Sequence, residues 1–224
     1  MKNRVAKRIG ALLLSLALCV SAAPDVRAAS SFDSCADLDR HAWSAPGVRF
    51  CLKNEMMTGY GKRIRLFDPD KPMTRAQLVT ILWRMAGEPK TGLAMQYSDV
   101  PEGQWYTDAV RWALAEDVMG GYTAVTFAPD DPVTREETVV LLWGYAGWLN
   151  GSVPKFTDAV YENYRDYGEV SADAREAMGW ACALGIITGY QNRYGLWLRP
   201  QGDSSRAAVA TMLFRFCLDL GIYE

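Results

Sequence analysis

Histidine, paired cysteines and long hydrophobic runs are all scarce in this 224-residue sequence. It contains one histidine, His41, and no Cys-x-x-Cys pair. Structural zinc sites take four cysteine or histidine ligands at short spacings, so this composition excludes a recognisable metal site. His41 also lacks a serine or cysteine motif of the kind that marks a nucleophilic enzyme. These absences favour a binding or structural protein over a catalyst.

Only residues 9–20 form a hydrophobic run, and this run is too short to span a bilayer comfortably. A basic segment precedes it and Val-Arg-Ala follows at 26–28, so we expect residues 1–28 to be a secretory signal. The alternative is a lipoprotein signal at Cys19, but bulky Leu18 stands where a lipobox takes a smaller residue. Without a second run, the mature chain is expected to have no membrane span.

Basic charge is also in short supply. The formal charge of the whole chain is −2, and loss of residues 1–28 leaves 19 basic and 25 acidic side chains, or −6. Proteins that bind nucleic acid need clustered basic residues, so nucleic acid is excluded as a partner. Because no membrane span is expected in the mature chain, its retention at a cell would come from binding another molecule.

Four cysteines follow the predicted signal. Export permits disulfides, and the natural pairing is one bond near each end of the chain, Cys35 to Cys51 and Cys182 to Cys217. The alternative is that all four are small buried hydrophobic residues without a bond.

What the sequence does contain is an internal repeat. Thr74-Arg75 and Thr134-Arg135 each open an apolar segment, and Ser205-Arg206 opens a degraded third copy. Apolar residues recur four, seven, eight and eleven positions after each arginine, which is one face of a helix. These positions hold Val79, Leu82, Trp83 and Ala86, then Val139, Leu142, Trp143 and Ala146, then Ala210, Leu213, Phe214 and Cys217. Thr with Gln or Glu three residues later predicts a capping box in the first two copies, and the third loses half of it.

A second predicted helix precedes each of these segments, and a Gly-Tyr pair follows it. The glycines are Gly59, Gly121 and Gly189. A glycine is expected to close each helix through the left-handed region of backbone conformation. Aspartates lead into these helices, at Asp37, Asp99 and Asp158. A tryptophan follows in the first two copies, at Trp43 and Trp105, whereas Asp173 stands in its place in the third.

The repeats therefore predict helix, loop, helix units of about sixty residues, none of which can bury its apolar stripe alone. We divide the chain into the signal at 1–28 and repeats at 32–91, 92–153 and 154–224, the last divergent and carrying an insertion. The expected fold is all-α, with the units in a pseudo-threefold arrangement. The tryptophans within the helices, Trp83, Trp112, Trp143 and Trp180, are expected in the core.

These motifs resemble the S-layer homology (SLH) family. The second copy carries them most completely: Tyr97-Ser98-Asp99-Val100, Trp105 to Val110, Val118 to Tyr122, Phe127-Ala128-Pro129 and Thr134-Arg135-Glu136-Glu137. The resemblance implies a three-pronged domain around a central helix bundle, with grooves between neighbouring repeats. It also implies a ligand, the secondary cell wall polysaccharide attached to peptidoglycan in Gram-positive envelopes. This polymer often bears a pyruvate ketal, and its noncovalent binding anchors a secreted protein at the cell surface.

The resemblance assigns ligand binding to the motif residues Arg75, Arg135, Arg206, Thr74, Thr134, Asp37, Asp99, Asp158, Trp43, Trp105, Gly59, Gly121 and Gly189. Gln77, Ala208 and Asp173 depart from the family pattern, which puts the groove that uses the third repeat in doubt.

The residues themselves support an anionic ligand. An arginine in the first turn of a helix lies where the helix dipole already favours anions, and its planar fork can bind a carboxylate with two hydrogen bonds. The alternative is that each arginine is a latch, paired with an aspartate of a neighbouring repeat.

The function that this sequence indicates is a wall-binding module without catalytic residues, cofactor or metal. One alternative is a surface module of the same fold that binds a protein and has lost sugar affinity. Another is a glycosidase that uses paired acids such as Asp130 and Asp131 or Glu136 and Glu137, but these pairs sit at helix starts, where acids are favoured in any case.

Overall fold

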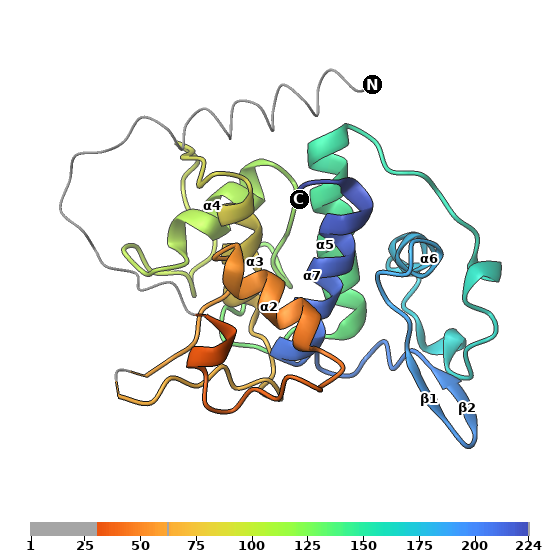
Figure 1. Cartoon of the computed structure of the whole chain (residues 1–224). Coiled ribbons are helices and arrows are strands. Elements are labelled where there is room, and N and C mark those ends of the chain that lie inside the picture. The colour runs from red at the N-terminus through yellow and green to blue at the C-terminus, as the bar shows by residue number, and fades with distance from the viewer. Residues whose placement is uncertain (1–30, 62, 224) are drawn as a thin grey trace.

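The structure, a computed structural model, describes residues 31–61 and 63–223. The predicted secretory signal and the alternative lipoprotein signal lie outside these residues. Within them the chain forms six α-helices, short 3-10 turns and a single two-stranded hairpin (Figure 1). The prediction of an all-α fold is therefore confirmed.

The three long helices begin at the repeated arginines. They are α3 (Arg75–Met85), α5 (Arg135–Asn150) and α7 (Arg206–Leu220). Thr74 and Thr134 each accept a hydrogen bond from the backbone N–H three residues on, and the Gln77 and Glu137 side chains accept one in return. Ser205 makes only the first half of this box, as predicted. The local capping signal thus sets the start of each helix.

The shorter helices end earlier than the sequence suggested. They are α2 (Ala45–Lys53), α4 (Thr107–Ala115) and α6 (Arg175–Ala183). The residues that turn through the left-handed region after them are Glu55, Asp117 and Gly185, at φ angles of 56°, 54° and 67°. The prediction that the glycine of each Gly-Tyr pair closes the helix was wrong.

Two of these Gly-Tyr glycines are needed instead because neighbouring atoms lie too close to the backbone to leave room for a side chain. A Cβ on Gly121 would lie 2.3 Å from the carbonyl oxygen of Thr126 and 2.5 Å from a ring carbon of Tyr97. A Cβ on Gly189 would meet the Trp197 carbonyl and the Tyr164 ring at the same 2.5 Å. Side chains at these positions would push the loop off the aromatic ring that supports it.

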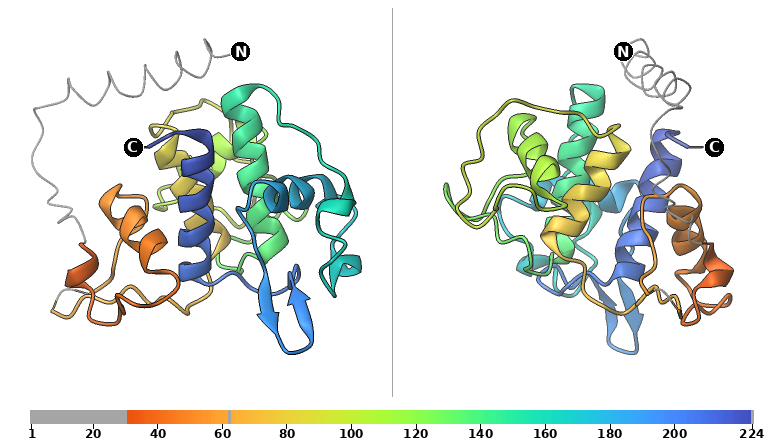
Figure 2. Two further views of the ribbon diagram at one scale, coloured as in Figure 1. Left: turned by 45° about the vertical axis from the view of Figure 1, so that its right-hand side comes forward. Right: turned by 90° about the vertical axis from the view of Figure 1, so that its left-hand side faces the viewer.

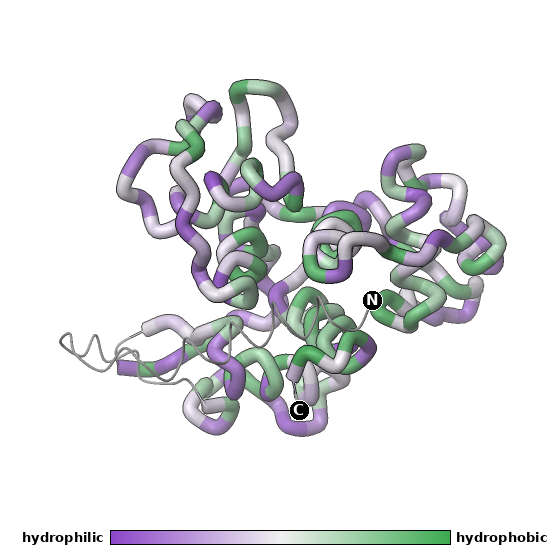
Figure 3. The backbone as a smooth tube through the Cα atoms, turned by 90° about the horizontal axis from the view of Figure 1, so that it is seen from above, coloured by the Kyte–Doolittle hydropathy of each residue, from purple (hydrophilic) through white to green (hydrophobic). Residues whose placement is uncertain are grey.

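Each short helix packs against a long helix of another predicted repeat. The pairs are α4 with α3, α6 with α5, and α2 with α7, so the first repeat contacts the last (Figure 2). The predicted apolar stripe lies in this core, with Val79, Leu142 and Ala210 fully buried. Trp83, Trp112 and Trp180 are buried as expected, and Trp143 packs partly buried against the same core. Figure 3 shows hydrophobic residues along the helices at the centre, whereas the outer loops carry both hydrophilic and hydrophobic residues.

A ring of backbone hydrogen bonds joins the three helix starts. The N–H of Met73 donates to the carbonyl of Ser204, that of Ser204 to Val133, and that of Val133 to Met73, each at 2.8 Å. Three segments that lie far apart in the sequence therefore hold one another in cyclic order. This ring fixes the relative positions of the arginines that follow.

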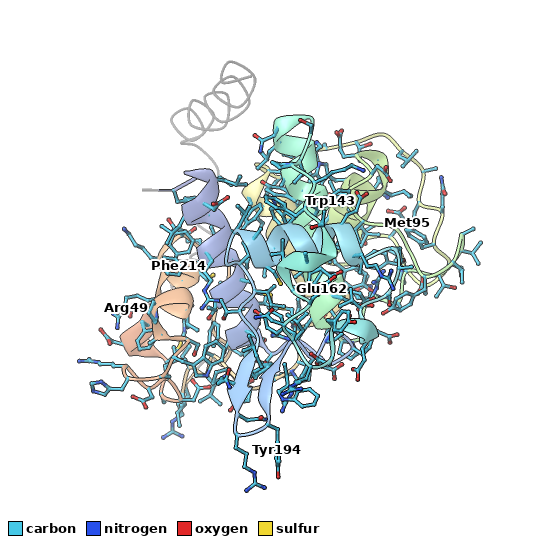
Figure 4. The ribbon with its side chains drawn as sticks, turned by 90° about the vertical axis from the view of Figure 1, so that its right-hand side faces the viewer. Arg49, Met95, Trp143, Glu162, Tyr194 and Phe214 are labelled. Carbon is cyan, nitrogen blue, oxygen red and sulfur yellow. The ribbon has the colours of Figure 1, made fainter. Side chains whose placement is uncertain are left out.

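The third predicted repeat contains two features that its sequence did not reveal to us. Its insertion, residues 161–169, contains the turn η3 (Tyr167–Glu169) and is preceded by the turn η2 (Asp158–Val160). Both are short 3-10 turns like η1 (Phe32–Ser34) near the start of the described chain. Its loop forms a hairpin of β1 (Tyr190–Asn192) and β2 (Gly195–Trp197). The hairpin projects from the body, with Tyr194 at its tip (Figure 4).

The predicted disulfides were wrong: Cys35, Cys51, Cys182 and Cys217 are all free. Burial raises the pKa of the Cys182 and Cys217 thiols to about 12 in each case. The cysteines therefore act as small apolar residues. In the part of the chain that is described, no helix has the length and hydrophobicity needed to cross a membrane.

Candidate functional site: three sites between repeats

The three repeated arginines are buried between neighbouring repeats. Arg75, Arg135 and Arg206 are 4%, 5% and 4% exposed. The Nε of each donates to the carbonyl of the aromatic or leucine residue in a neighbouring Phe-x-Pro or Leu-x-Pro loop. The distances are 2.8 Å to Phe127, 2.7 Å to Leu198 and 2.8 Å to Phe67, respectively. Each arginine therefore joins the start of its own helix to a loop of another repeat.

A tyrosine ring lies against each guanidinium. The ring centroids of Tyr60, Tyr122 and Tyr190 are 4.6 Å, 4.1 Å and 4.7 Å from the guanidinium carbons of Arg206, Arg75 and Arg135. These are the tyrosines of the Gly-Tyr pairs, so the tyrosine of each pair makes a cation–π contact with an arginine of another repeat. We name the arrangements by the repeat of the tyrosine: site 1 (Arg206, Tyr60), site 2 (Arg75, Tyr122) and site 3 (Arg135, Tyr190).

The remaining contacts of the guanidinium groups differ between sites. At site 2, Arg75 also donates to the Gly120 carbonyl at 2.9 Å and pairs with the Glu137 carboxylate at 3.2 Å. At site 1, Arg206 donates to the Thr58 carbonyl at 2.9 Å. At site 3, Arg135 lies 3.3 Å from the Tyr190 hydroxyl. Burial lowers the pKa of both Arg135 and Arg206.

The arginines therefore do form latches, but through carbonyl oxygens rather than through the predicted aspartates. Those aspartates hold the loops from inside each repeat. Asp37 accepts from the N–H groups of Phe67 and Asp68, and Asp99 accepts from those of Phe127 and Ala128. Carboxylates that accept two backbone N–H bonds fix the loop whose carbonyl the arginine then binds.

In the third repeat Asp166 holds the loop in this way. Asp166 is 5% exposed and accepts from the N–H groups of Leu198 and Arg199 at 2.8 Å and 2.7 Å. The insertion places Asp166 outside the spacing of the first two repeats, which is why the sequence comparison selected Asp158 as the lead-in aspartate and passed over Asp166. The aromatic-x-Asp pattern of Tyr164-Arg165-Asp166 was the signal that could have identified it.

Trp43 and Trp105 are the exposed aromatic residues among the predicted contacts, at 65% and 56%. Trp43 reaches a cavity of about 540 Å³ at site 3. The cavity is lined by Trp43, Arg135, Ile186, Ile187, Thr188, Gly189, Tyr190, Gln191, Ala208, Thr211, Met212 and Arg215. It thus combines one residue of the first repeat and one of the second with ten of the third.

The structure brings the predicted contacts together unevenly. Trp43, Arg135 and Gly189 share the site 3 cavity. Thr74 and Thr134 cap helices through their side chains, and Gly59 and Gly121 lie tightly against neighbouring atoms. Sequence reasoning missed Arg215 and Arg199, because neither belongs to a motif that repeats in all three copies.

Of the acid pairs considered for a glycosidase, Glu136 and Glu137 have structural partners. Glu137 caps α5, and Glu136 accepts from the Ser171 hydroxyl at 2.6 Å and from the Ser171 N–H at 3.1 Å. Within residues 31–61 and 63–223, no cluster of three or more His, Cys, Asp or Glu side chains could hold a metal ion.

The chain is similar in sequence to known cell-surface proteins and to an enzyme. The chain is 30% identical over 142 residues to a cellulosome-anchoring protein of Acetivibrio thermocellus, covering 60% of this chain and 31% of that protein. It is 27% identical over 160 residues to a surface layer protein of Brevibacillus choshinensis, covering 68% and 14%. An endoglucanase of Bacillus sp. matches at 24% identity over 221 residues, covering 95% and 22%.

The chain therefore spans less than a third of the length of each of these relatives. The family model of the S-layer homology domain matches residues 36–79 and 96–139. Each matched segment runs from a lead-in aspartate region through Gly-Tyr to the start of a long helix. Two segments of this chain, one in each of its first two predicted repeats, thus match the S-layer homology domain.

Proposed function

We propose that this protein is a non-catalytic cell-surface module that binds secondary cell wall polysaccharide and anchors itself noncovalently to a Gram-positive-type envelope. The observation that carries the proposal is the site 3 cavity, which is lined by both an exposed tryptophan, Trp43, and a buried arginine, Arg135. The names of the relatives, a cellulosome-anchoring protein and a surface layer protein, support a location at the cell wall.

The cavity suits a sugar that carries an acidic group. Its volume of about 540 Å³ lies within the range of small-ligand sites, roughly 300 to 1,000 Å³. The indole of Trp43 offers an apolar face to a pyranose ring, and the guanidinium of Arg135 offers N–H donors to a carboxylate. The pyruvate ketal is such a carboxylate, so an anionic, pyruvylated sugar is the ligand we propose.

Absence of catalysis is part of the same proposal. A glycosidase needs two carboxyl groups that face each other across a substrate. Glu136 and Glu137 are instead committed to Ser171 and to the capping box. Any activity of the relatives that are named as enzymes is attributed to parts of those proteins that this chain does not match.

Co-sedimentation with peptidoglycan sacculi tests the proposal. The chain from residue 29 onward is mixed with sacculi that carry their wall polymer and with sacculi stripped of it by acid. It should pellet only with the first. Trp43→Ala should reduce the pelleted fraction, because it removes the ring-stacking face, whereas Tyr194→Ala should not, although Tyr194 is 62% exposed and Trp43 65%.

Equal pelleting with both kinds of sacculi would mean that peptidoglycan itself is the ligand. Pelleting with neither would contradict sugar binding and favour the alternative, a surface module for protein partners on the same fold. A loss with Tyr194→Ala as large as that with Trp43→Ala would move the binding surface from the cavity to the hairpin.

A further inference from the structure

We propose that the three sites are not equivalent, and that the acidic group of the ligand binds at site 3 and is excluded from site 2 by the protein's own Glu137. This inference rests on the proposed function and specifies where on the chain the acid binds. It reverses the expectation from the sequence, which placed the greatest doubt on the site built from the third repeat.

Site 2 already contains a carboxylate. Glu137 Oε1 lies 3.2 Å from Nη1 of Arg75, and the two side chains are 25% and 5% exposed. The other oxygen of Glu137 accepts from the Thr134 N–H at 2.7 Å, so the carboxylate is held in place by the helix start. A ligand acid would have to displace Glu137 from Arg75 or lie beside it, and like charges repel at that distance.

Site 3 has no such acid. The position that corresponds to Glu137 is Ala208, which lines the cavity. In the described part of the chain, no carboxylate forms an ion pair with Arg135. Asp166 does act electrostatically on Arg135, but its two oxygens accept backbone N–H bonds from Leu198 and Arg199.

Two further arginines raise the positive charge of site 3. The guanidinium carbon of Arg199 lies 4.9 Å from the centroid of the same Tyr190 ring that Arg135 contacts at 4.7 Å. Arg215 lines the cavity and is oriented toward the Thr188 hydroxyl at 3.2 Å. Arg135 and Arg199 repel each other across the Tyr190 ring, and a bound anion would offset this repulsion.

Site 1 is intermediate. Gln77 takes the position of Glu137 and is neutral, but Asp68 stands in the loop position that Arg199 occupies at site 3. Asp68 acts electrostatically on Arg206 there, and Lys71 lies 5.6 Å from the Tyr60 ring centroid. The opposed charges of Asp68 and Lys71 leave site 1 less positive than site 3.

The test transfers the carboxylate of site 2 to site 3. Ala208→Glu introduces an acid where Glu137 stands in the other repeat, and Ala208→Gln introduces a side chain of the same size without charge. Both residues complete the capping box with Ser205, as Glu137 and Gln77 do in the other copies, so neither variant should melt below the parent chain.

The measurement is calorimetric titration of the chain from residue 29 onward with a hexopyranoside that bears a pyruvate ketal, and with the same glycoside without the ketal. The parent chain should prefer the ketal. Ala208→Gln is the reference of equal size, and Ala208→Glu should bind the ketal at least about tenfold more weakly than Ala208→Gln, as expected when a charged hydrogen bond to the ligand is lost.

Equal affinity of the Ala208→Glu and Ala208→Gln variants would overturn the inference while leaving the proposed function intact. Failure of the parent chain to bind either glycoside or decorated sacculi would overturn both. If the Ala208 variants misfold, Arg215→Gln replaces them, with Arg193→Gln at the exposed hairpin as the control for net charge. The inference then requires a loss of affinity of about tenfold with Arg215→Gln alone, and equal affinities would overturn it.

Discussion

Removal of the Arg206 guanidinium should destabilise the fold, because this group closes the contact between the last and the first repeat. Its Nε donates to the Phe67 carbonyl at 2.8 Å and its Nη2 to the Thr58 carbonyl at 2.9 Å. The rings of Tyr60 and Phe67 both lie 4.6 Å from its guanidinium carbon. Arg206→Ala deletes all four contacts.

The magnitude follows from the burial of the groups left behind. A buried carbonyl without a donor costs about 1–3 kcal/mol, and the half-exposed one of Thr58 belongs at the low end of that range. Loss of the ring contacts adds about 1 kcal/mol. Burial also lowers the pKa of Arg206, so the desolvation that is relieved offsets part of this loss. We expect a net loss of about 3 kcal/mol, or about 6–12 °C in melting temperature for a domain of this size.

Thermal unfolding followed by circular dichroism measures this shift. Arg40→Ala is the control, because Arg40 makes a surface ion pair with Asp33 in which the side chains are 70% and 55% exposed, and such pairs contribute about 0–1 kcal/mol. Arg206→Lys should fall close to Arg206→Ala, since an ammonium cannot reach two carbonyls with the geometry of a guanidinium fork. A melting temperature for Arg206→Ala equal to that of Arg40→Ala would refute the latch.

Three other predictions concern single residues elsewhere in the fold. Gly121→Ala should lower the melting temperature by more than a typical surface substitution, because its Cβ would lie 2.5 Å from Tyr97. Asp166→Asn should cost about 1–2 kcal/mol in a denaturant titration, since two charge-assisted bonds to backbone N–H groups become weaker. At pH 8, Cys217 should react with a thiol reagent roughly a thousandfold more slowly in the native than in the unfolded chain, because burial raises its pKa to about 12. Disulfide formation would contradict the last prediction. It would appear as an intact mass lower by the hydrogens of the bonded thiols.

The sequence predicted the long helices well because their signals are local. The residues Thr134 and Glu137 make their capping box within four positions, and the apolar stripe behind them needs no knowledge of the rest of the fold. The ends of the short helices were missed because Glu55 and Asp117 turn through the left-handed region without glycine. In addition, the Gly-Tyr pair suggested the end of a helix. The glycines of two pairs are instead needed because the backbone lies close to an aromatic ring.

The partners of the arginines were harder to predict for a different reason. Every residue has a backbone carbonyl oxygen, so residue type does not identify which carbonyl accepts a hydrogen bond. Nothing about Phe67 or Leu198 in the sequence therefore indicates that its backbone is the acceptor for an arginine of another repeat. The sequence suggested charge pairing with aspartates because only side chains are visible there. Likewise, Asp166 was missed because the insertion moves it out of the repeat spacing, although its Tyr-x-Asp pattern was present in the sequence.

A consequence of this geometry is that the repeated arginine cannot be used to separate binding from stability. Arg135 supports the Leu198 loop through its Nε and also lines the site 3 cavity, so Arg135→Ala should reduce melting temperature and ligand affinity together. The two roles separate only at positions that line the cavity without holding a loop. Ala208 is such a position, because its side chain makes no polar contact and its repeat tolerates a longer one at the corresponding Gln77 and Glu137. We therefore expect the residues that distinguish the three sites, rather than those they share, to determine where an acidic ligand binds.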